Sequence, residues 1–256
     1  MKKIEISRNI YQYSFVSPDR SFSDNIFVIL QNKKALIIDT AFEETALQVR
    51  EDLEKQGISA ETVIISHLHD DHIMGNCVFK DCKFYVHPIY NAQIEYRELI
   101  KKAFAECSDI SFVENGMEIK YGDVSLKLFY APGHHISGLT IVLNGTIVFA
   151  NDLVIHSNDG KAALPYIDSG STIDEHIASL AFLKELDPEI LISGHGNMMV
   201  KNEIAEAIDE RLFYLRKLNE FGGEAKIEDC LQNALTEYSH IGFHFSNLQK
   251  VFKRTL

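Results

Sequence analysis

Short apolar runs alternate with amphipathic stretches along the first half of the chain. Residues 43–57 have the periodicity of a helix, for which Thr40 and Glu43 form a capping box and Gly57 is a terminator. Residues 31–33 separate two apolar runs and predict a hairpin turn. Runs rich in β-branched and aromatic residues predict strands at 25–30, 34–39, 61–66 and 83–88.

The second half of the chain continues this alternation. Two strands are predicted on either side of the Gly-Asp pair at 122–123, and the Asn-Gly pair at 144–145 marks a further hairpin. Thr172 and Glu175 form a capping box at the start of a helix over 173–187. The remaining predicted elements are a buried strand at 189–194 and helices at 89–106, 202–221 and 226–254.

This order of elements predicts an α/β fold. Strands dominate the start of the chain and helices alternate with strands thereafter, which favours two packed sheets with helices on the outside. The sequence has no internal repeat, low-complexity tract or linker. We therefore expect one domain over residues 1–256, with the C-terminal helices from about residue 202 packed as part of it.

Composition narrows the class of protein. The chain is 46% hydrophobic and 24% charged, which is typical of a globular protein. Its net charge of −12 disfavours nucleic acid as a partner, because an acidic surface repels phosphate. No apolar run reaches the about 18 residues of a membrane span, and residues 1–15 do not resemble a secretory signal. We expect a cytoplasmic protein with no membrane partner and four free thiols, Cys77, Cys82, Cys107 and Cys230.

The residues that can carry chemistry follow the ends of apolar runs. The sequence SHLHDDH at 66–72 completes the predicted strand at 61–66, and later runs end near further histidines and an aspartate. Binding and catalytic residues concentrate on such loops, where a rigid scaffold holds them. If the strands lie side by side, seven side chains can meet at one rim: His67, His69, Asp71, His72, His134, Asp152 and His195.

Five imidazoles and two carboxylates suit a pair of divalent metal ions. Zinc is the default metal for such donors, and iron or manganese are alternatives. His67 and His69 are two residues apart and can bind one metal from one side of an extended turn. The adjacent Asp71 and His72 can face a second metal. One further histidine would complete each set, and a carboxylate could bridge the two metals.

These motifs resemble those of the metallo-β-lactamase-fold hydrolase superfamily, which includes glyoxalase II-like and lactonase-like enzymes. The family motif H-x-H-x-D-H is present at 67–72. The family elements Pro-Gly-His, Gly-Asp and Gly-His-Gly correspond to residues 132–134, 151–152 and 194–196, in family order. The resemblance covers roughly residues 26–197. It implies a four-layer αβ/βα sandwich of two mixed β-sheets.

The resemblance also implies how the seven donors divide between two metals. Three histidines would hold the first metal, namely His67, His69 and His134. The second metal would be held by Asp71, His72 and His195. Asp152 would bridge the two.

Two positions depart from the family pattern. Asn151 stands where a glycine is common, and the carboxylate that follows it is kept. His135 follows the expected ligand where many relatives have threonine, and could alter the pocket. The Pro-Gly-His match favours His134 over His135 as the ligand.

The other acids and histidines are expected to have structural roles. Asp70 is expected to be solvated or to lie behind the ligands, and Asp39 to accept a hydrogen bond behind the site. No pattern supports a role in the site for the five remaining histidines, His87, His156, His176, His240 and His244.

The residues that select the substrate are expected outside the set of metal ligands, in residues 155–171 and the C-terminal helices. Lys161 and Tyr166 are the residues of that loop most able to meet an anionic or carbonyl group. A solvated lysine and a packed tyrosine are equally consistent with the sequence.

The predicted reaction is hydrolysis. A hydroxide bridging two metals would attack a carbonyl or phosphoryl centre, and Asp71 would act catalytically by orienting it. The favoured function is a zinc-dependent hydrolase of a small ester, thioester or lactone, with a small-molecule substrate as its partner. The alternatives are a phosphodiesterase, a β-lactamase, an iron-dependent oxidoreductase similar to persulfide dioxygenases, and a non-catalytic metal-binding domain. The sequence leaves the oligomeric state open.

Overall fold

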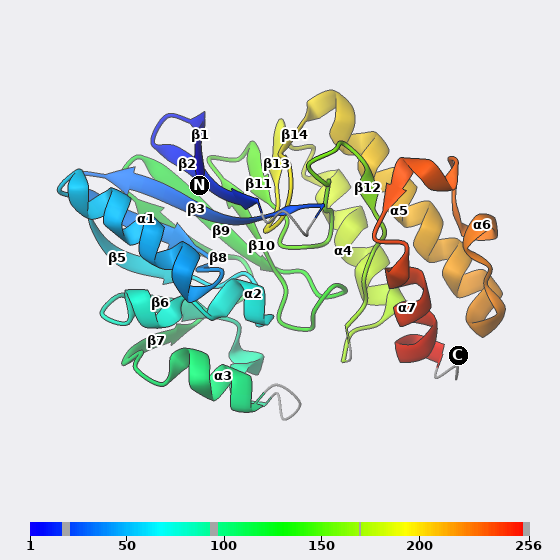
Figure 1. Ribbon diagram of the computed structural model, residues 1–256, viewed down its shortest axis with the longest axis horizontal. Coiled ribbons are helices and arrows are strands. Elements are labelled where there is room, and N and C mark those ends of the chain that lie inside the picture. The colour runs from blue at the N-terminus through cyan, green and yellow to red at the C-terminus, as the bar shows by residue number, and fades with distance from the viewer. Residues whose placement is uncertain (17–20, 93–96, 169, 253–256) are drawn as a thin grey trace.

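Two mixed β-sheets form the centre of the computed structural model, which describes residues 1–16, 21–92, 97–168 and 170–252 (Figure 1). The first sheet has seven strands in chain order, antiparallel from the first to the fourth and parallel from the fourth to the seventh. These strands are β1 (Lys2–Ser7), β2 (Ile10–Val16), β3 (Ser23–Gln31), β4 (Lys34–Ile38), β5 (Ser59–Ile64), β6 (Lys83–Val86) and β7 (Asp109–Phe112).

The second sheet has six strands, and a separate pair of two-residue strands lies near the C-terminal helices. The six are β8 (Met117–Tyr121), β9 (Val124–Tyr130), β10 (Leu139–Leu143), β11 (Ile147–Phe149), β13 (Ile190–Ile192) and β14 (Met199–Val200). Their order is β14-β13-β11-β10-β9-β8, in which β11 and β13 are parallel. The separate pair is β12 (Ala162–Ala163) and β15 (Tyr238–Ser239).

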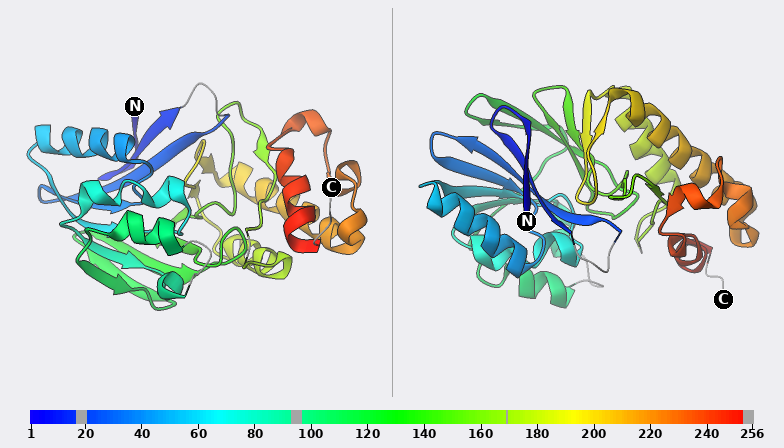
Figure 2. Two further views of the ribbon diagram at one scale, coloured as in Figure 1. Left: turned by 60° about the horizontal axis from the view of Figure 1, so that its bottom comes forward. Right: turned by 45° about the horizontal axis from the view of Figure 1, so that its top comes forward.

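Helices cover the outer faces of the two large sheets. The α-helices are α1 (Glu43–Lys55), α2 (Asp70–Ile73), α3 (Arg97–Phe104), α4 (Ile173–Glu185), α5 (Lys201–Phe221), α6 (Ile227–Cys230) and α7 (Gly242–Phe252). Short 3₁₀ helices are η1 (Asn76–Phe79), η2 (Pro88–Asn91), η3 (Gly222–Glu224) and η4 (Leu235–Glu237). In Figures 1 and 2, α1 and α3 lie beside the first sheet, and α4, α5 and α7 lie on the opposite side of the molecule.

Three buried apolar clusters separate these four layers. One lies between the first sheet and α1 and α3, one between the two sheets, and one between the second sheet and α4, α5 and α7. Strand β3 shows how alternation builds two of them: Ile26 and Val28 face the helices, whereas Phe27 and Ile29 face the other sheet. The prediction of a four-layer αβ/βα sandwich is confirmed.

The turn chemistry predicted from the sequence is confirmed at three hairpins. Asn32 and Lys33 join β3 to β4, Gly122 lies between β8 and β9, and Asn144 and Gly145 join β10 to β11. All five residues have a positive φ, which the asparagines and glycines among them adopt at little cost.

One of the two predicted capping boxes is wrong. Thr172 caps α4 as predicted, because its hydroxyl accepts from Glu175 N while the Glu175 carboxylate accepts from Thr172 N. Thr40 does not cap α1: its hydroxyl is buried and lies 2.8 Å from Asn76 Oδ1 and 3.1 Å from the carbonyl of His72. Tertiary hydrogen bonds have taken the place of the local cap, so Thr40 supports the segment that carries the histidine cluster.

The C-terminal region also departs from prediction. The helix predicted at 202–221 is present as α5, but the single helix predicted at 226–254 is wrong. It divides into α6, η4, β15 and α7, and its last two residues lie outside the described ones. Pairing of Tyr238 and Ser239 with Ala162 and Ala163 holds this segment extended against the loop after β11. Similarly, the helix predicted at 89–106 begins as η2 and continues as α3, and its residues 93–96 are not described.

The structure also bears on two expectations drawn from composition. The four cysteines are free thiols. Within the described ranges, no helix has both the length and the apolar character needed to cross a membrane.

Replacing the cap of α4 should destabilise the fold. Thr172→Ala removes the acceptor of the Glu175 amide, and we expect a loss of about 1 kcal/mol in the free energy of unfolding. Urea denaturation followed by circular dichroism measures it. Thr236→Ala, at an exposed threonine of η4, is the matched control and should change stability by less than about 0.5 kcal/mol. Equal effects of the two substitutions would contradict the capping role.

Candidate metal centre

The structure brings all seven predicted side chains to one rim of the sandwich. His67 and His69 follow β5 directly, and Asp71 and His72 lie on the short helix α2. The other three follow strands of the second sheet: His134 follows β9, Asp152 follows β11 and His195 follows β13. A backbone hydrogen bond of 2.8 Å from Leu139 N to Ser66 O joins the two sheets beside the cluster.

Three histidines form the first group of donors. His69 Nδ1 lies 3.1 Å from His67 Nε2 and 3.1 Å from His134 Nε2. Two ligands of a tetrahedral zinc ion, each about 2.0–2.1 Å from the metal, lie about 3.4 Å apart. The observed spacings are therefore close to those of a ligand set, and the three rings are the ones predicted for a first metal.

Asp71, His72 and His195 form a second group. His72 Nε2 lies 3.7 Å from Asp71 Oδ1, and His195 Nε2 lies 3.4 Å from Asp71 Oδ2. The rings of His72 and His195 are buried, whereas the Asp71 side chain is 23% exposed and borders the cavity described below. Asp71 is thus the member of this group that a substrate can approach.

Asp152 lies between the two groups. Its Oδ2 atom is 3.1 Å from His195 Nε2 and 3.2 Å from His72 Nε2, on the second side. The same atom is 3.7 Å from His134 Nε2 and 3.8 Å from His67 Nε2, on the first side. One carboxylate therefore faces both groups of donors.

The donor set fits metal ions. Asp152 is 5% exposed, and among the described residues its Oδ1 atom has no hydrogen-bond partner. An uncompensated buried carboxylate oxygen is costly, and a bound cation removes that cost. The donors also pack so closely that position 194 must be glycine, because a Cβ there would lie 2.3 Å from His72 Cε1 and 2.7 Å from Asp152 Oδ1.

Carboxylates behind the site orient three of the five histidines. His72 Nδ1 lies 2.8 Å from Asp39 Oδ2, and Asp39 also accepts from the amide and hydroxyl of Ser66. His195 Nδ1 lies 3.3 Å from Asp24 Oδ1. Since an ionised carboxylate only accepts, each ring donates from this nitrogen and keeps the other for a metal. Asp39 was expected in this role, whereas Asp24 was not recognised in the sequence.

The third such carboxylate, Asp168, was also missed. Its Oδ2 lies 3.0 Å from His69 Nε2, and its Oδ1 forms an ion pair with Lys250 of α7. Lys250 also donates to the hydroxyl of Tyr166. Asp168 follows a loop with no periodicity, and 99 residues separate it from His69, so no local pattern could reveal the pair.

His135 is not part of the first group of donors. Its Nδ1 lies 2.7 Å from Ser137 Oγ, and its Nε2 lies 3.8 Å from Asp168. His69, His135 and Asp168 are close enough to form a further metal-binding group. Because Lys250 already neutralises Asp168, we assign this carboxylate to holding His69.

The remaining predicted bystanders lie outside the donor groups. Asp70 is exposed and accepts a hydrogen bond from the amide of Asp71. Lys161 extends toward Asp159 at 3.9 Å, whereas Tyr166 lines the cavity above His134. Among the other histidines, His240 lies near the centre through its stacking on Phe22. The rest are engaged elsewhere: His87 accepts from the amide of Ile89, His156 lies near Gly160 O, His176 near Leu153 O and His244 near Tyr214.

Burial and charge set the protonation of the centre before a metal binds. Burial holds the pKa of His67 and His134 well below the usual range, so both rings are neutral donors. Burial also lowers the pKa of His72, but the carboxylates of Asp152 and Asp39 outweigh it and raise the pKa to about 10. The pKa of His195 is raised in the same way, by Asp152 above all, against the effect of burial. The rings of His72 and His195, in the second group of donors, are therefore both protonated at neutral pH.

A cavity of about 220 Å³ opens onto the donors. It is lined by residues of the metal site together with apolar and aromatic side chains: Phe22, His69, Asp70, Asp71, His134, Asp152, Ile155, Tyr166, His195 and Phe243. Such a cavity lies below the about 300–1,000 Å³ of typical ligand pockets and suits a small substrate.

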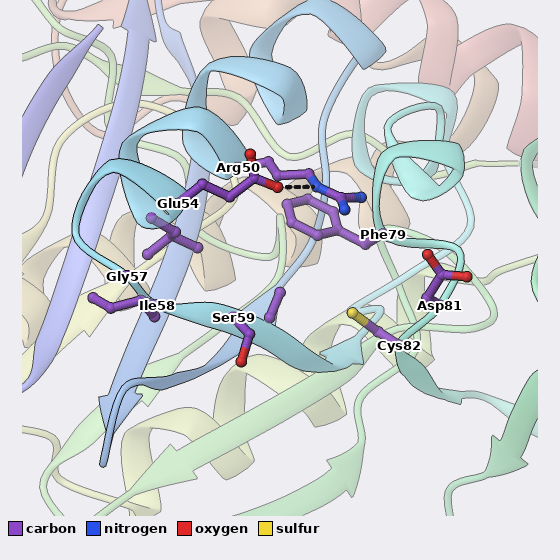
Figure 3. Close-up of a pocket in the computed structure, with 10 residues that line it drawn as sticks. Arg50, Glu54, Gly57, Ile58, Ser59, Phe79, Asp81 and Cys82 are labelled. Carbon is purple, nitrogen blue, oxygen red and sulfur yellow. Dashed lines mark hydrogen bonds and ion pairs between the residues drawn. The ribbon is translucent and has the colours of Figure 1, made fainter.

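A second cavity, of about 310 Å³, lies beneath α1 and away from the donors (Figure 3). Arg50 there pairs with Glu54 and donates to the carbonyl of Val78. Burial raises the pKa of the Cys82 thiol to about 11, so the thiol is protonated at neutral pH. Its arginine is thus paired and its thiol is protonated, and we place the functional site at the smaller cavity, which contains the donors.

A sandwich that gathers histidines and aspartates at one rim of two mixed sheets defines a hydrolase-like metalloprotein fold. The chain belongs to the metallo-beta-lactamase superfamily, whose family model matches residues 20–195. The match includes all seven donors.

Curated relatives are distant and extend beyond this chain. A Drosophila melanogaster protein named beta-lactamase-like protein 2 homolog is 20% identical over 77% of this chain and 64% of its own length. A probable metallo-hydrolase of Methanocaldococcus jannaschii is 23% identical over 66% of this chain and 74% of its own length. The hydroxyacylglutathione hydrolase of Brucella ovis is 27% identical over 54% of this chain and 51% of its own length. This chain thus spans less than two thirds of the fly and Brucella proteins.

Solved structures share the fold. A metallo-beta-lactamase family protein of Thermus thermophilus superimposes with a TM-score of 0.65 at 14% identity, over 85% of this chain and 83% of that one. A metallo-beta-lactamase of Pontibacter korlensis gives a TM-score of 0.65 at 14% identity, over 82% and 98% of the two chains. At such low identity these likenesses establish the fold alone.

Metal affinity should rise with pH. A metal at the second side must displace the protons held by His72 and His195, and raising the pH toward the His72 pKa of about 10 removes this competition. We expect the apparent zinc affinity to increase by about one to two powers of ten per pH unit between about pH 6 and 9. Chelator-competition titrations measure it. A pH-independent affinity over this range would contradict the proton assignment.

Removing Asp168 should weaken metal binding without removing a ligand. Asp168→Ala leaves His69 Nε2 without its carboxylate, and loss of such a partner lowers metal affinity by about 10- to 100-fold. The same chelator titration measures the change at fixed pH. Asp123→Ala, in the exposed turn between β8 and β9, is the control and should bind zinc as the unmodified protein does. Equal affinities of both variants would show that Asp168 does not position His69.

Proposed function

We propose that this protein is a dinuclear metal-dependent hydrolase, with zinc as the metal, that cleaves a small ester, thioester or lactone. The observation that carries the proposal is the position of Asp152 Oδ2, within 3.8 Å of four imidazole nitrogens from the two donor groups. A single carboxylate so placed suits a bridge between two metals. Borderline-soft imidazole donors favour zinc, and iron or manganese remain compatible with the same set.

The centre, when occupied, supplies a Lewis acid for the substrate carbonyl and a water molecule of lowered pKa. The protein's own groups then position the reactants. The charge and hydrogen bond of His195 outweigh burial and hold the pKa of Asp71 below its usual range, so its carboxylate is ionised. Asp71 borders the cavity and can accept a hydrogen bond from the attacking water, which orients the water toward the substrate.

Charge and size favour a small substrate over a polymer. The chain has a net charge of −12, and Asp70 and Asp71 both border the cavity, which disfavours polyanions such as nucleic acids. The relative named hydroxyacylglutathione hydrolase lends support to a thioester. Four free thiols suit the reducing cytoplasm, where we propose that the enzyme acts.

Metal removal and one substitution test the proposal. Chelator-treated protein should lose hydrolysis of a model thioester and a model lactone, and zinc should restore it. Asp71→Asn should lower kcat by about 10²-fold or more, because a neutral amide orients the attacking water less strongly than a carboxylate anion does. Asp70→Asn, at the neighbouring carboxylate outside the donor groups, should cost far less. Full activity of the metal-free protein, or equal losses for the two variants, would overturn the proposal.

A wider panel distinguishes the alternative functions. Turnover of bis-p-nitrophenyl phosphate above that of thioesters would indicate a phosphodiesterase, and efficient nitrocefin turnover a β-lactamase. Bound iron with oxygen uptake in the presence of a persulfide would indicate an oxidoreductase. Metal loading without turnover of any of these would leave a metal-binding role.

A further inference from the structure

Four aromatic rings form an arc beside the metal centre, and three of them line its cavity. The rings of Phe22 and His240 are stacked at 4.5 Å, and those of His240 and Phe243 at 5.0 Å. The arc ends on Tyr166, whose ring lies 5.0 Å from that of Phe243. We call these four residues the aromatic arc.

The aromatic arc spans both halves of the metal centre. At one end Phe22 lies 4.5 Å from the ring of His195, a donor of the second group. At the other end Tyr166 lies 5.6 Å from the ring of His134 and 6.3 Å from that of His69, donors of the first group. The aromatic arc therefore lies beside both groups of donors.

The rings of the aromatic arc are available to a ligand. All four residues are partly buried, and Phe22, Tyr166 and Phe243 line the cavity. They come from separate parts of the chain: the segment before β3, the loop after β11 and the start of α7. Asn247 of α7 donates a hydrogen bond to Pro165 O and accepts one from Ile167 N, and these two bonds fix α7 against the base of the loop. The arc is thus held by tertiary contacts rather than by one flexible segment.

Charge and volume limit what the aromatic arc can accept. Phe22 and Phe243 offer only apolar ring surface to the cavity, so a charged substituent packed against them would lose its hydration without gaining a partner. Burial lowers the pKa of His240, so its ring adds no positive charge at neutral pH. Lys250 lies 4.6 Å from the centroid of the Tyr166 ring, but its charge is already paired with Asp168. A cavity of about 220 Å³ has room for one ring beside the carbonyl.

We propose that the acyl group of the substrate is neutral, apolar and planar, an arylacyl group that packs on the aromatic arc while its carbonyl lies over the metal centre. The proposal rests on the hydrolase function proposed above and names its substrate class. Offset or edge-on packing of aromatic rings supplies selectivity for a planar group over an equally apolar but non-planar one.

A substrate series with one leaving group tests the acyl preference. The zinc-loaded protein is given N-acetylcysteamine thioesters of acetic, cyclohexylacetic and phenylacetic acid. We expect kcat/KM for the phenylacetyl thioester to exceed that for the acetyl thioester by about tenfold or more, with the cyclohexylacetyl thioester between them. A phenylacetyl-to-acetyl ratio of one or less would overturn the proposal.

Variants of Phe243 test whether the aromatic arc causes the preference for the phenylacetyl group. Phe243→Ala should reduce the phenylacetyl-to-acetyl ratio of kcat/KM by about tenfold, and Phe243→Leu, which keeps apolar bulk, should reduce it less. Phe245→Ala is the matched control: this residue is on the same helix, is 47% exposed and does not line the cavity. If Phe243→Ala and Phe245→Ala retain the same ratio, the arc does not select the acyl group.

A binding measurement separates this inference from the hydrolase function. Calorimetric titration of the zinc-loaded protein with phenylacetate and with acetate should give about tenfold tighter binding of phenylacetate, lost in Phe243→Ala. Selective binding without hydrolysis of any thioester would refute the hydrolase function and support the arc. Hydrolysis with neither selective binding nor acyl preference would refute the arc alone.

Discussion

The buried carboxylate of Asp152 is the charge around which the rim of the sandwich is organised. Its side chain is 3% exposed and is surrounded by imidazoles of both sheets. A buried carboxylate is tolerated only when neighbouring groups balance it. In the metal-free chain, protons on His72 and His195 provide that balance, which is why their pKa values are raised. The same positions are free to accept metal ions once those protons leave.

The requirement to place these donors also constrains the glycines beside them. Gly194 has no space for a Cβ, since His72 and Asp152 occupy it. Gly133 has a φ of +137° and would drive a Cβ to 2.3 Å from the Cα of His176, so α4 packs directly beneath the turn that carries His134. Rigid strands and these close contacts hold the donors together, and small motions of the loops would not disperse them.

Residues near both ends of the chain support the centre by contacting donor histidines or the carboxylates that hold them. Asp24 on β3 contacts His195, and Lys250 on α7 pairs with Asp168, which holds His69. The C-terminal helices therefore do more than cover the second sheet. The same helix, α7, begins beside the aromatic arc, so metal positioning and the proposed acyl selection depend on one element.

The sequence was sufficient for features that depend on local pattern and insufficient for those that depend on distant contacts. Apolar strands, turns with positive φ and donors that follow strand ends are visible in a few adjacent residues, so the sandwich and the convergence of seven side chains could be predicted. Asp168 and Phe22 lie in segments with no periodicity, and their roles come from partners 99 and 173 residues away. Thr40 had the pattern of a cap but bonds to Asn76 instead. The prediction of one helix at 226–254 is wrong because Tyr238 and Ser239 pair with the loop after β11.

The claim that Asp152 joins two donor groups into one centre is tested most directly by locating bound metal. Crystals of the zinc-loaded protein, measured at the zinc absorption edge, should show two anomalous peaks on either side of the Asp152 carboxylate, about 3.5–4 Å apart. Elemental analysis of the same preparation should give two zinc ions per chain. A single peak, or peaks away from the seven donors, would contradict the account.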